Sequence, residues 1–219
     1  MIKSILKDTI YGFLAGAMIS IGCAVYLACE NKYVGAIMFS VALLTICYKG
    51  YNLFTGKIGF IVNAHAKNDV SALLLGLLGN TLAMMAFGAL LGLALPNLQE
   101  KAVTVVSAKL SQGFVSALIR AIFCGILMYI AVSLYREKKT IVGIVFCIPV
   151  FILSGFEHSI ADMGYFAVAG EWSGVGLGYI WTIILGNSLG ATLFSFSISV
   201  ISSLSFVKSK RVRLREPIV

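Results

Sequence analysis

Long apolar segments separated by short polar ones run along the whole chain. Six of them are long enough to cross a lipid bilayer, because about 20 mostly apolar residues span its hydrocarbon core. They cover approximately residues 10–29, 33–64, 70–95, 113–135, 140–169 and 176–207, and a polar linker occupies 97–112. The pattern predicts an all-α integral membrane protein with six transmembrane helices.

The fifth segment contains polar residues near its middle, where a continuous membrane helix would be apolar. Glu157, His158 and Asp162 lie there, and ionisable residues at this depth are costly. Ser154 and Glu157 have the S-x-x-E spacing of a capping box, which is typical of a helix N-terminus. We therefore predict that two half-helices meet at Ser154-Gly155 and that the second one opens with Glu157 and His158.

The second segment also contains a break, and a short motif repeats in the two halves of the chain. Residues 33–64 are too long for one straight crossing and contain Thr55-Gly56. The motif L-G-N-[TS]-L-[AG] occurs at 78–83 and at 185–190, each time in the third segment of a half. Three crossings per half make the halves antiparallel, which is the inverted-repeat arrangement of many channels and transporters.

The repeat predicts the domain organisation. We expect one channel domain over residues 1–219, with inverted repeats at about 8–96 and 113–207 and a substrate path where the broken helices meet. Asn80 and Asn187 are the polar residues of the repeated motif. Since amide groups inside a membrane need hydrogen-bond partners, we interpret both as tethers of the broken loops.

The distribution of charge indicates how the chain lies in the membrane. Only 12% of the residues are charged, the mean hydropathy is +0.97 and the formal net charge is +8. The N-terminus, two of the connections and the tail carry eleven Lys and Arg residues: Lys3, Lys7, Lys67, Arg136, Lys138, Lys139, Lys208, Lys210, Arg211, Arg213 and Arg215. The opposite connections carry three: Lys32, Lys101 and Lys109. This bias predicts a multi-pass protein of the cell membrane with both termini in the cytoplasm. The basic tail, 208–219, is expected to contact lipid headgroups rather than nucleic acid.

The predicted half-helices favour the binding of an anion. A helix that starts at mid-membrane presents unpaired N–H groups and a positive dipole end to the path, so it attracts an anion without a formal charge. Thr55 can cap or line the first break. His158, in the first turn after the second break, can exchange a proton with a weak-acid anion, although a hydrogen-bonded structural histidine is the alternative. We interpret Glu157 as a capping group rather than a proton relay.

Apolar and basic residues complete the candidate path. Four apolar side chains are candidates for constrictions that close by dewetting, with ordinary packing as the alternative for each: Phe39, Leu43, Leu53 and Phe151. Two cations lie within apolar segments. We expect Arg120 to snorkel toward the outer end of its helix, and Lys49 to line a vestibule or a subunit contact.

Taken together, these motifs resemble the formate/nitrite transporter family. The most specific is SGFEHSIADM at 154–163, which is similar to the family signature G-F-E-H-S-[IV]-A-[ND]-M. LFTG at 53–56, LGN at 78–80 and GN at 186–187 occur in the family's order. The resemblance implies an aquaporin-like protomer that assembles as a homopentamer, with a pore for small monovalent anions such as formate, nitrite or hydrosulfide in each protomer.

The resemblance also assigns residues. It implies that Thr55 is the threonine of the loop that breaks the second helix and that His158 is the central pore histidine. It places Phe39, Leu43, Leu53 and Phe151 at the hydrophobic constrictions, and Arg120 and Glu157 on an arginine and a glutamate common in the family.

The chain departs from the family pattern at several positions. Gly125 stands where many members have an asparagine that can hydrogen-bond the histidine, which predicts that His158 loses a partner or gains a water. Asp162 stands where asparagine is common, and Lys49 and Lys57 add positive charge around the first break.

The sequence thus favours a passive or proton-coupled channel for a small monovalent anion, with no cofactor. A channel for small neutral solutes is the first alternative. A membrane-embedded enzyme using His158 with Glu157 or Asp162 is a second, and a purely structural subunit is a third. A metal site is disfavoured because His65 and His158 lie in different segments without an H-E-x-x-H motif or a cysteine pair.

Overall fold

The computed structural model describes residues 2–63 and 67–213, with side chains at 2–62 and 69–204. His65, the end of the second predicted segment and the end of the basic tail lie outside the described residues. Within the described ranges the elements are helices. The long ones are α1 (Ile2–Ala28), α2 (Lys32–Lys49), α4 (Lys67–Ala94), α6 (Phe114–Lys138) and α9 (Gly174–Arg213). The short ones are α3 (Phe54–Lys57), the 3-10 helix η1 (Ile58–Asn63), α5 (Pro96–Leu110), α7 (Val142–Leu153) and α8 (Ser159–Ala169).

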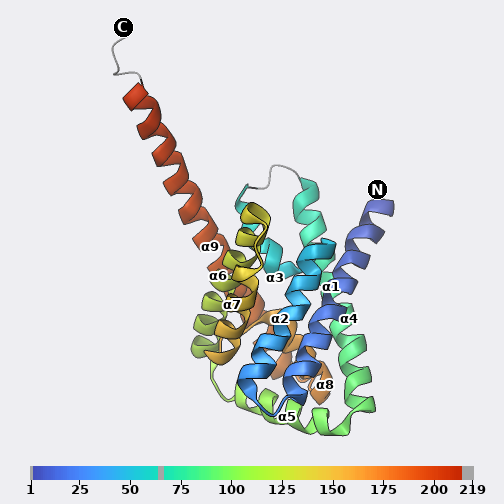
Figure 1. Cartoon of the computed structure of the whole chain (residues 1–219). Coiled ribbons are helices and arrows are strands. Elements are labelled where there is room, and N and C mark those ends of the chain that lie inside the picture. Colours follow the sequence, from blue (N-terminus) through green and yellow to red (C-terminus); the bar gives the residue numbers. More distant parts are fainter. Residues whose placement is uncertain (1, 64–66, 214–219) are drawn as a thin grey trace.

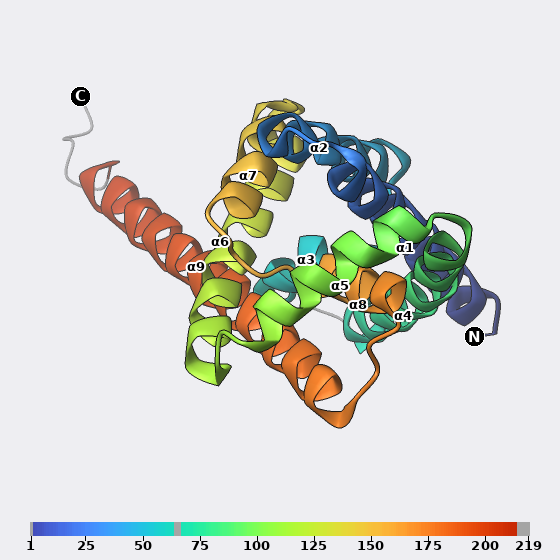
Figure 2. The ribbon, with the colours of Figure 1, turned by 90° about the horizontal axis from the view of Figure 1, so that it is seen from below.

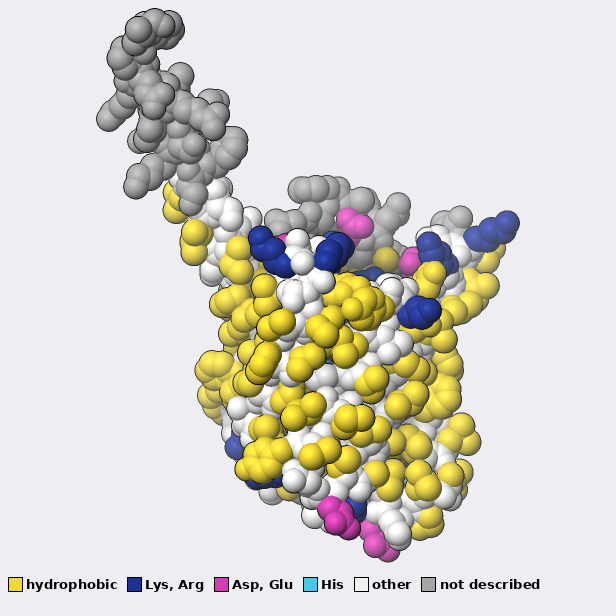
Figure 3. All heavy atoms as spheres, in the orientation of Figure 1, with side chains coloured by type: hydrophobic (Ala, Val, Ile, Leu, Met, Phe, Trp, Pro, Cys, Tyr) yellow, Lys and Arg dark blue, Asp and Glu magenta, His cyan; other side chains and the backbone are white. Residues whose placement is uncertain are grey.

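The helices form a bundle that suits a membrane, which confirms the prediction of an all-α membrane protein. All five long helices are apolar enough to span a bilayer over most or all of their length, and α7 is a shorter apolar helix. Apolar side chains cover the sides of the bundle, while most Lys and Arg gather at the end from which the N-terminus and α9 project (Figures 1 and 3). Such an exposed apolar belt between polar ends is what lipid-facing surfaces require.

Two helix pairs form the framework, and each contains one copy of the repeated motif. α1 packs mainly against α4, and α6 against α9. The motif glycines allow this close approach, because a Cβ on Gly79 would lie 2.2 Å from the Thr9 carbonyl oxygen and one on Gly186 2.8 Å from that of Leu118. Small residues at such crossings bring membrane helices into backbone contact.

The first break lies earlier than the sequence predicted. α2 ends at Gly50, which has φ +69° in the left-handed region, and α3 begins at Phe54 after an extended Leu53. Thr55 and Gly56 lie inside α3 and not at the break. Gly50 sets the position because it adopts the left-handed conformation at no steric cost.

The second break lies where the sequence predicted it, but its capping differs. α7 ends at Ser154, Gly155 has φ +68°, and α8 begins at Ser159. The predicted capping box is wrong: His158 is the N-cap, and its Nδ1 accepts a hydrogen bond from the Ala161 N–H at 3.1 Å. Ser154 caps the end of α7 through its backbone, and the Glu157 side chain pairs with a lysine instead.

The predicted polar linker is also wrong, because residues 96–110 form α5. Pro96 ends α4 and occupies the first turn of α5, where its missing N–H is not needed. Ala102 and Val106, one turn apart, are buried beneath the helix, and its polar residues up to Ser107 are exposed. Viewed from the end opposite the termini, α5 runs across the bundle beside α8 (Figure 2), against which it packs.

Candidate functional site

Two asparagines hold the starts of the half-helices α3 and α8 in matching ways. The Asn80 side-chain oxygen accepts from the Phe54 N–H at 2.9 Å, and its nitrogen donates to the carbonyls of Gly12 at 2.7 Å and Asn52 at 3.0 Å. Both asparagines are fully buried. Each therefore ties the first helical N–H of a half-helix to a neighbouring long helix.

Asn187 repeats this network in the second half. Its oxygen accepts from the Ser159 N–H at 2.9 Å, and its nitrogen donates to the carbonyls of Ala121 and Glu157, each at 2.8 Å. The two networks use equivalent positions, namely the first residue of the half-helix, the residue two before it, and a residue of the first long helix. Both half-helices are therefore anchored at their N-termini inside the bundle.

His158 and Thr55 bring the two half-helices together. His158 Nε2 lies 2.9 Å from Thr55 Oγ1, and both residues are almost completely buried. Because Nδ1 accepts from the Ala161 N–H, the proton of a neutral imidazole is on Nε2 and is donated to the threonine oxygen. The site centre is thus a neutral N–H donor beside a hydroxyl group.

The histidine keeps two partners although the chain lacks the family's asparagine at position 125. Gly125 packs against α9, and a Cβ there would lie 2.2 Å from the Asn187 carbonyl oxygen. A larger side chain therefore does not fit this helix packing. Thr55 and the Ala161 N–H occupy the two ring nitrogens instead.

Apolar side chains enclose the histidine. The Phe151 ring stacks on the imidazole with centroids 5.5 Å apart, and Phe39 meets Phe151 edge-on at 6.3 Å. Leu53 directly precedes α3, and Leu43 lies on α2 beside it at the base of a cavity. These four side chains are at most 4% exposed, so the polar centre is closed by packed apolar groups.

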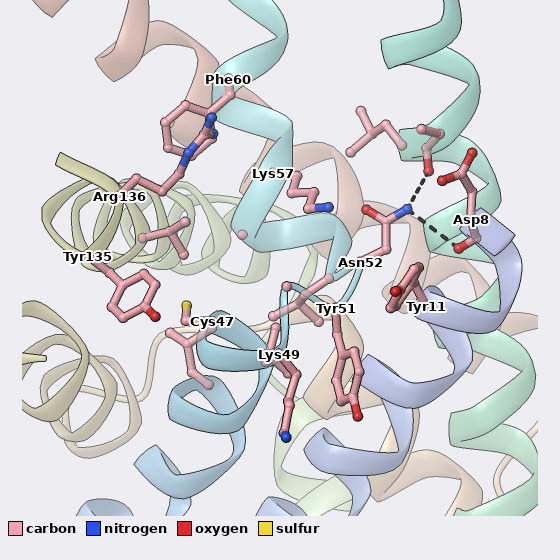
Figure 4. Close-up of a pocket in the computed structure, with 18 of the residues that line it drawn as sticks. Asp8, Tyr11, Cys47, Lys49, Tyr51, Asn52, Lys57, Phe60, Tyr135 and Arg136 are labelled. Carbon is pink, nitrogen blue, oxygen red and sulfur yellow. Dashed lines mark hydrogen bonds between the residues drawn. The ribbon is translucent and has the colours of Figure 1, made fainter. Parts of the chain in front are cut away.

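A basic vestibule leads to the leucine side of this site. It is a cavity of about 890 Å³ at the end of the bundle that carries the termini, and Figure 4 shows its lining. Its charged lining residues are four cations and two carboxylates, which gives a net charge of +2: Lys7, Lys49, Lys57, Arg136, Asp8 and Asp69. The predicted vestibule position of Lys49 agrees with this placement, and Lys57 lies there as well.

A buried ionic cluster lies at the start of α8, with one carboxyl group before the histidine and one a turn after it. Lys109 of α5 pairs with Glu157 and with Asp162, whose Oδ1 lies 2.9 Å from the ammonium. Gln112 donates to the other Glu157 oxygen at 2.8 Å. Burial lowers the pKa of Lys109, but the charges of Asp162 and Glu157 raise it more, so its pKa lies above the ordinary value and the ammonium is retained.

Lys109 and Gln112 were not among the predicted site residues, because both lie in the stretch that was predicted to be a polar linker. The spacing of Ala102, Val106 and Lys109 places them on one helix face, and this was the available signal. Arg120 has two hydrogen-bond partners within the bundle. It donates to the Gly155 carbonyl at 3.2 Å and to the Ser116 hydroxyl at 3.2 Å, and so supports the second break.

These features define a class of protein: a helical membrane protein whose two broken helices meet at a buried polar centre beside a basic vestibule. Comparison with known sequences identifies the family. A family model described as formate/nitrite transporter matches residues 2–201, and the chain therefore belongs to the formate/nitrite transporter family. It is a multi-pass membrane protein.

Individual relatives agree with this assignment. The chain is 28% identical to the uncharacterized transporter YrhG of Bacillus subtilis (strain 168), over 93% of this chain and 86% of that protein. It is 26% identical to the nitrite transporter NirC of Escherichia coli (strain K12), over 83% and 78% of the two chains. A solved structure described as a pentameric formate channel with formate bound has the same fold, with a TM-score of 0.78, 22% identity and coverage of 92% and 98%.

Family membership also decides whether the protein is an enzyme. Its members, and the solved channels with this fold, are transporters and channels rather than enzymes. This confirms the prediction that the protein is not an enzyme and removes the membrane-embedded enzyme as an alternative. Family membership and fold together support an anion channel.

Proposed function

We propose that the protein conducts small monovalent anions such as formate, nitrite or hydrosulfide, and that His158 and Thr55 form the polar centre of its pore. The observation that carries the proposal is the meeting of two half-helix N-termini at the buried His158–Thr55 pair, with a net cationic vestibule on one side. Half-helix ends and lysines attract an anion, and the enclosing apolar side chains strip its water. The names of two relatives, nitrite transporter and formate channel, point to the same substrates.

His158 can act on the anion in two ways. As a neutral ring it donates the Nε2 hydrogen bond, now made to Thr55, to an anion that reaches the centre. Transfer of a proton requires the imidazolium form, in which Nδ1 carries a proton and no longer accepts from the Ala161 N–H. The ring then gives its Nε2 proton to the anion, and the neutral acid leaves past the apolar constrictions. We infer that proton-coupled passage depends on release of this cap.

The proposed architecture extends the same argument. The matching Asn80 and Asn187 networks support two inverted repeats, at 8–96 and 113–207, in one aquaporin-like channel domain. The cationic end of the bundle supports cytoplasmic termini, with the basic tail at lipid headgroups. The relative described as a pentameric channel supports a homopentamer with one pore per protomer.

Flux into proteoliposomes tests the function. We would measure formate, nitrite, hydrosulfide and glycerol at two pH values for the wild type, His158→Asn and His158→Ala. Asparagine is a good N-cap, but its amide exchanges no proton. If His158 transfers a proton to the anion, we expect anion flux to depend on pH in the wild type and to lose this dependence in His158→Asn.

The control variant separates chemistry from folding. His158→Ala lacks the N-cap side chain. A loss of anion flux that occurs only in His158→Ala would therefore assign the histidine a structural role. Glycerol flux without flux of any of the anions would overturn the proposal and assign the protein to the channels for neutral solutes.

A further inference from the structure

The buried cluster at the start of α8 contains more negative than positive charge. Glu157 and Asp162 supply two carboxyl groups, with side chains 2% and 1% exposed, and Lys109 supplies one ammonium, 14% exposed. If both acids are ionised, the cluster has a net charge of −1. A charge that is buried without a partner is costly, so a site of this kind usually takes up a proton.

The hydrogen-bond partners show which carboxyl oxygen lacks a proton donor. Asp162 Oδ1 pairs with Lys109, but no donor from the described residues reaches the buried Asp162 Oδ2. The Glu157 and Asp162 side chains both contact the Lys109 ammonium, so their carboxyl groups lie close together. Two ionised carboxylates are both acceptors, whereas one shared proton turns the contact into a hydrogen bond.

Among the described side chains, only Lys109 forms an ion pair with Glu157 or Asp162. The other titratable groups around Asp162 are Cys23 of α1, Cys124 of α6, Tyr179 of α9, and His158 and Tyr165 of its own segment. α4, which packs closely on α8, presents Met84 and Gly88 there. A second cation, Arg120 of α6, donates to the Gly155 carbonyl at 3.2 Å and to Ser116, and so has partners other than the two carboxyl groups.

We propose that Glu157 and Asp162 hold one proton between them at neutral pH, so that the cluster with Lys109 is neutral overall. The proton comes from solvent and returns to it, and no other group changes its bonds. Its effect on transport rests on the proposed function. Since Asp162 and His158 lie one turn apart, joined by the Asp162 N–H to the His158 carbonyl at 2.8 Å, loss of the proton at alkaline pH puts a negative charge beside the path and repels an anion.

Infrared difference spectroscopy of the purified protein tests the proton directly and needs no transport activity. The carbonyl stretch of a protonated carboxyl group should be present in the wild type at pH 7. It should be absent from Asp162→Asn and from Glu157→Gln, because each variant leaves one carboxylate paired with one ammonium. Asp8→Asn, in the vestibule, should keep the band.

Each outcome decides the proposal. The absence of the band from the wild type overturns it, and so does persistence of the band in either variant of the cluster. Thermal unfolding and gel filtration check that the variants fold, and the nearly isosteric Asp162→Asn decides the question if Glu157→Gln does not fold. Absence of anion flux in liposomes would overturn the proposed function while leaving this result unchanged.

Discussion

The contact between His158 and Thr55 provides an acceptor for the proton that the imidazole carries on Nε2. Thr55 Oγ1 is the acceptor for the buried Nε2–H, at 2.9 Å. Thr55→Val keeps the size and shape of the side chain but removes the acceptor, and an unsatisfied buried donor costs about 1–3 kcal/mol. We expect Thr55→Val to unfold at a lower temperature than the wild type and Thr55→Ser to stay near it, as measured by thermal unfolding in detergent. Equal midpoints for the two variants would contradict the assigned hydrogen bond.

The sequence predicted some residues of the site correctly and others not. His158 and Asp162 stood out because ionisable residues are rare inside apolar segments. Glu157 was wrongly predicted to be a capping group, because the S-x-x-E spacing contains no information about a lysine that approaches from a helix distant in sequence. Lys109 itself gave no local signal of its partners, since Glu157 lies 48 residues further along the chain. Contacts between elements remote in sequence require the fold.

At the scale of elements, the two half-helices depend on their asparagines. Asn80 and Asn187 each make three hydrogen bonds, and a net contribution of about 1 kcal/mol per bond makes either one important for stability. We expect Asn80→Ala and Asn187→Ala to lower the unfolding midpoint by similar amounts, because their networks match.

A neighbouring position provides the control for this prediction. Thr81 follows Asn80, and its hydroxyl donates to the Leu77 carbonyl of its own helix at 3.0 Å, with a longer contact of 3.6 Å to the Met163 sulfur of α8. Thr81→Ala should therefore change the midpoint little. A large effect of Asn80→Ala with none of Asn187→Ala would contradict the equivalence of the two half-helices, and thermal unfolding of the three variants under one condition distinguishes these outcomes.

Element boundaries were predictable where a single residue sets them. Gly155 and Pro96 each end a helix, and the sequence placed both ends correctly. α2 ends at Gly50, earlier than expected. The break had been predicted at Thr55-Gly56, but these residues lie within α3. α5 was missed because the polar face of a surface helix has the composition of a loop.

At the scale of the whole molecule, the alternation of apolar and polar segments predicted an all-helical membrane protein and the order of its helices. Four predicted segments correspond to one long helix each, the second to α2 followed by α3 and η1, and the fifth to α7 followed by α8. The repeated motif identified the two asparagines whose hydrogen-bond networks match, Asn80 and Asn187. The lining of the 890 Å³ vestibule was not predictable, because it comes from the N-terminal parts of α1 and α4, the C-terminal parts of α2 and α6, and the segment that contains α3 and η1.

The charge of this vestibule leads to a prediction about the rate of anion entry. Its charged lining sums to +2, and Lys49→Gln with Lys57→Gln reduces this to zero. Electrostatic steering raises the local concentration of an anion and weakens with added salt. We expect the double variant to take up anion several-fold more slowly at low ionic strength and to approach the wild type near 1 M salt, where the Debye length is about 3 Å.

A matched control excludes a general effect of net charge. Lys3→Gln with Lys32→Gln removes the same charge from two exposed lysines that do not line the vestibule. This control should show uptake close to that of the wild type at every salt concentration. If both double variants slow uptake equally, the total charge of the protein and not the vestibule controls anion entry. If the vestibule variant is slow at high salt as well, Lys49 and Lys57 act by direct contact with the anion rather than by steering.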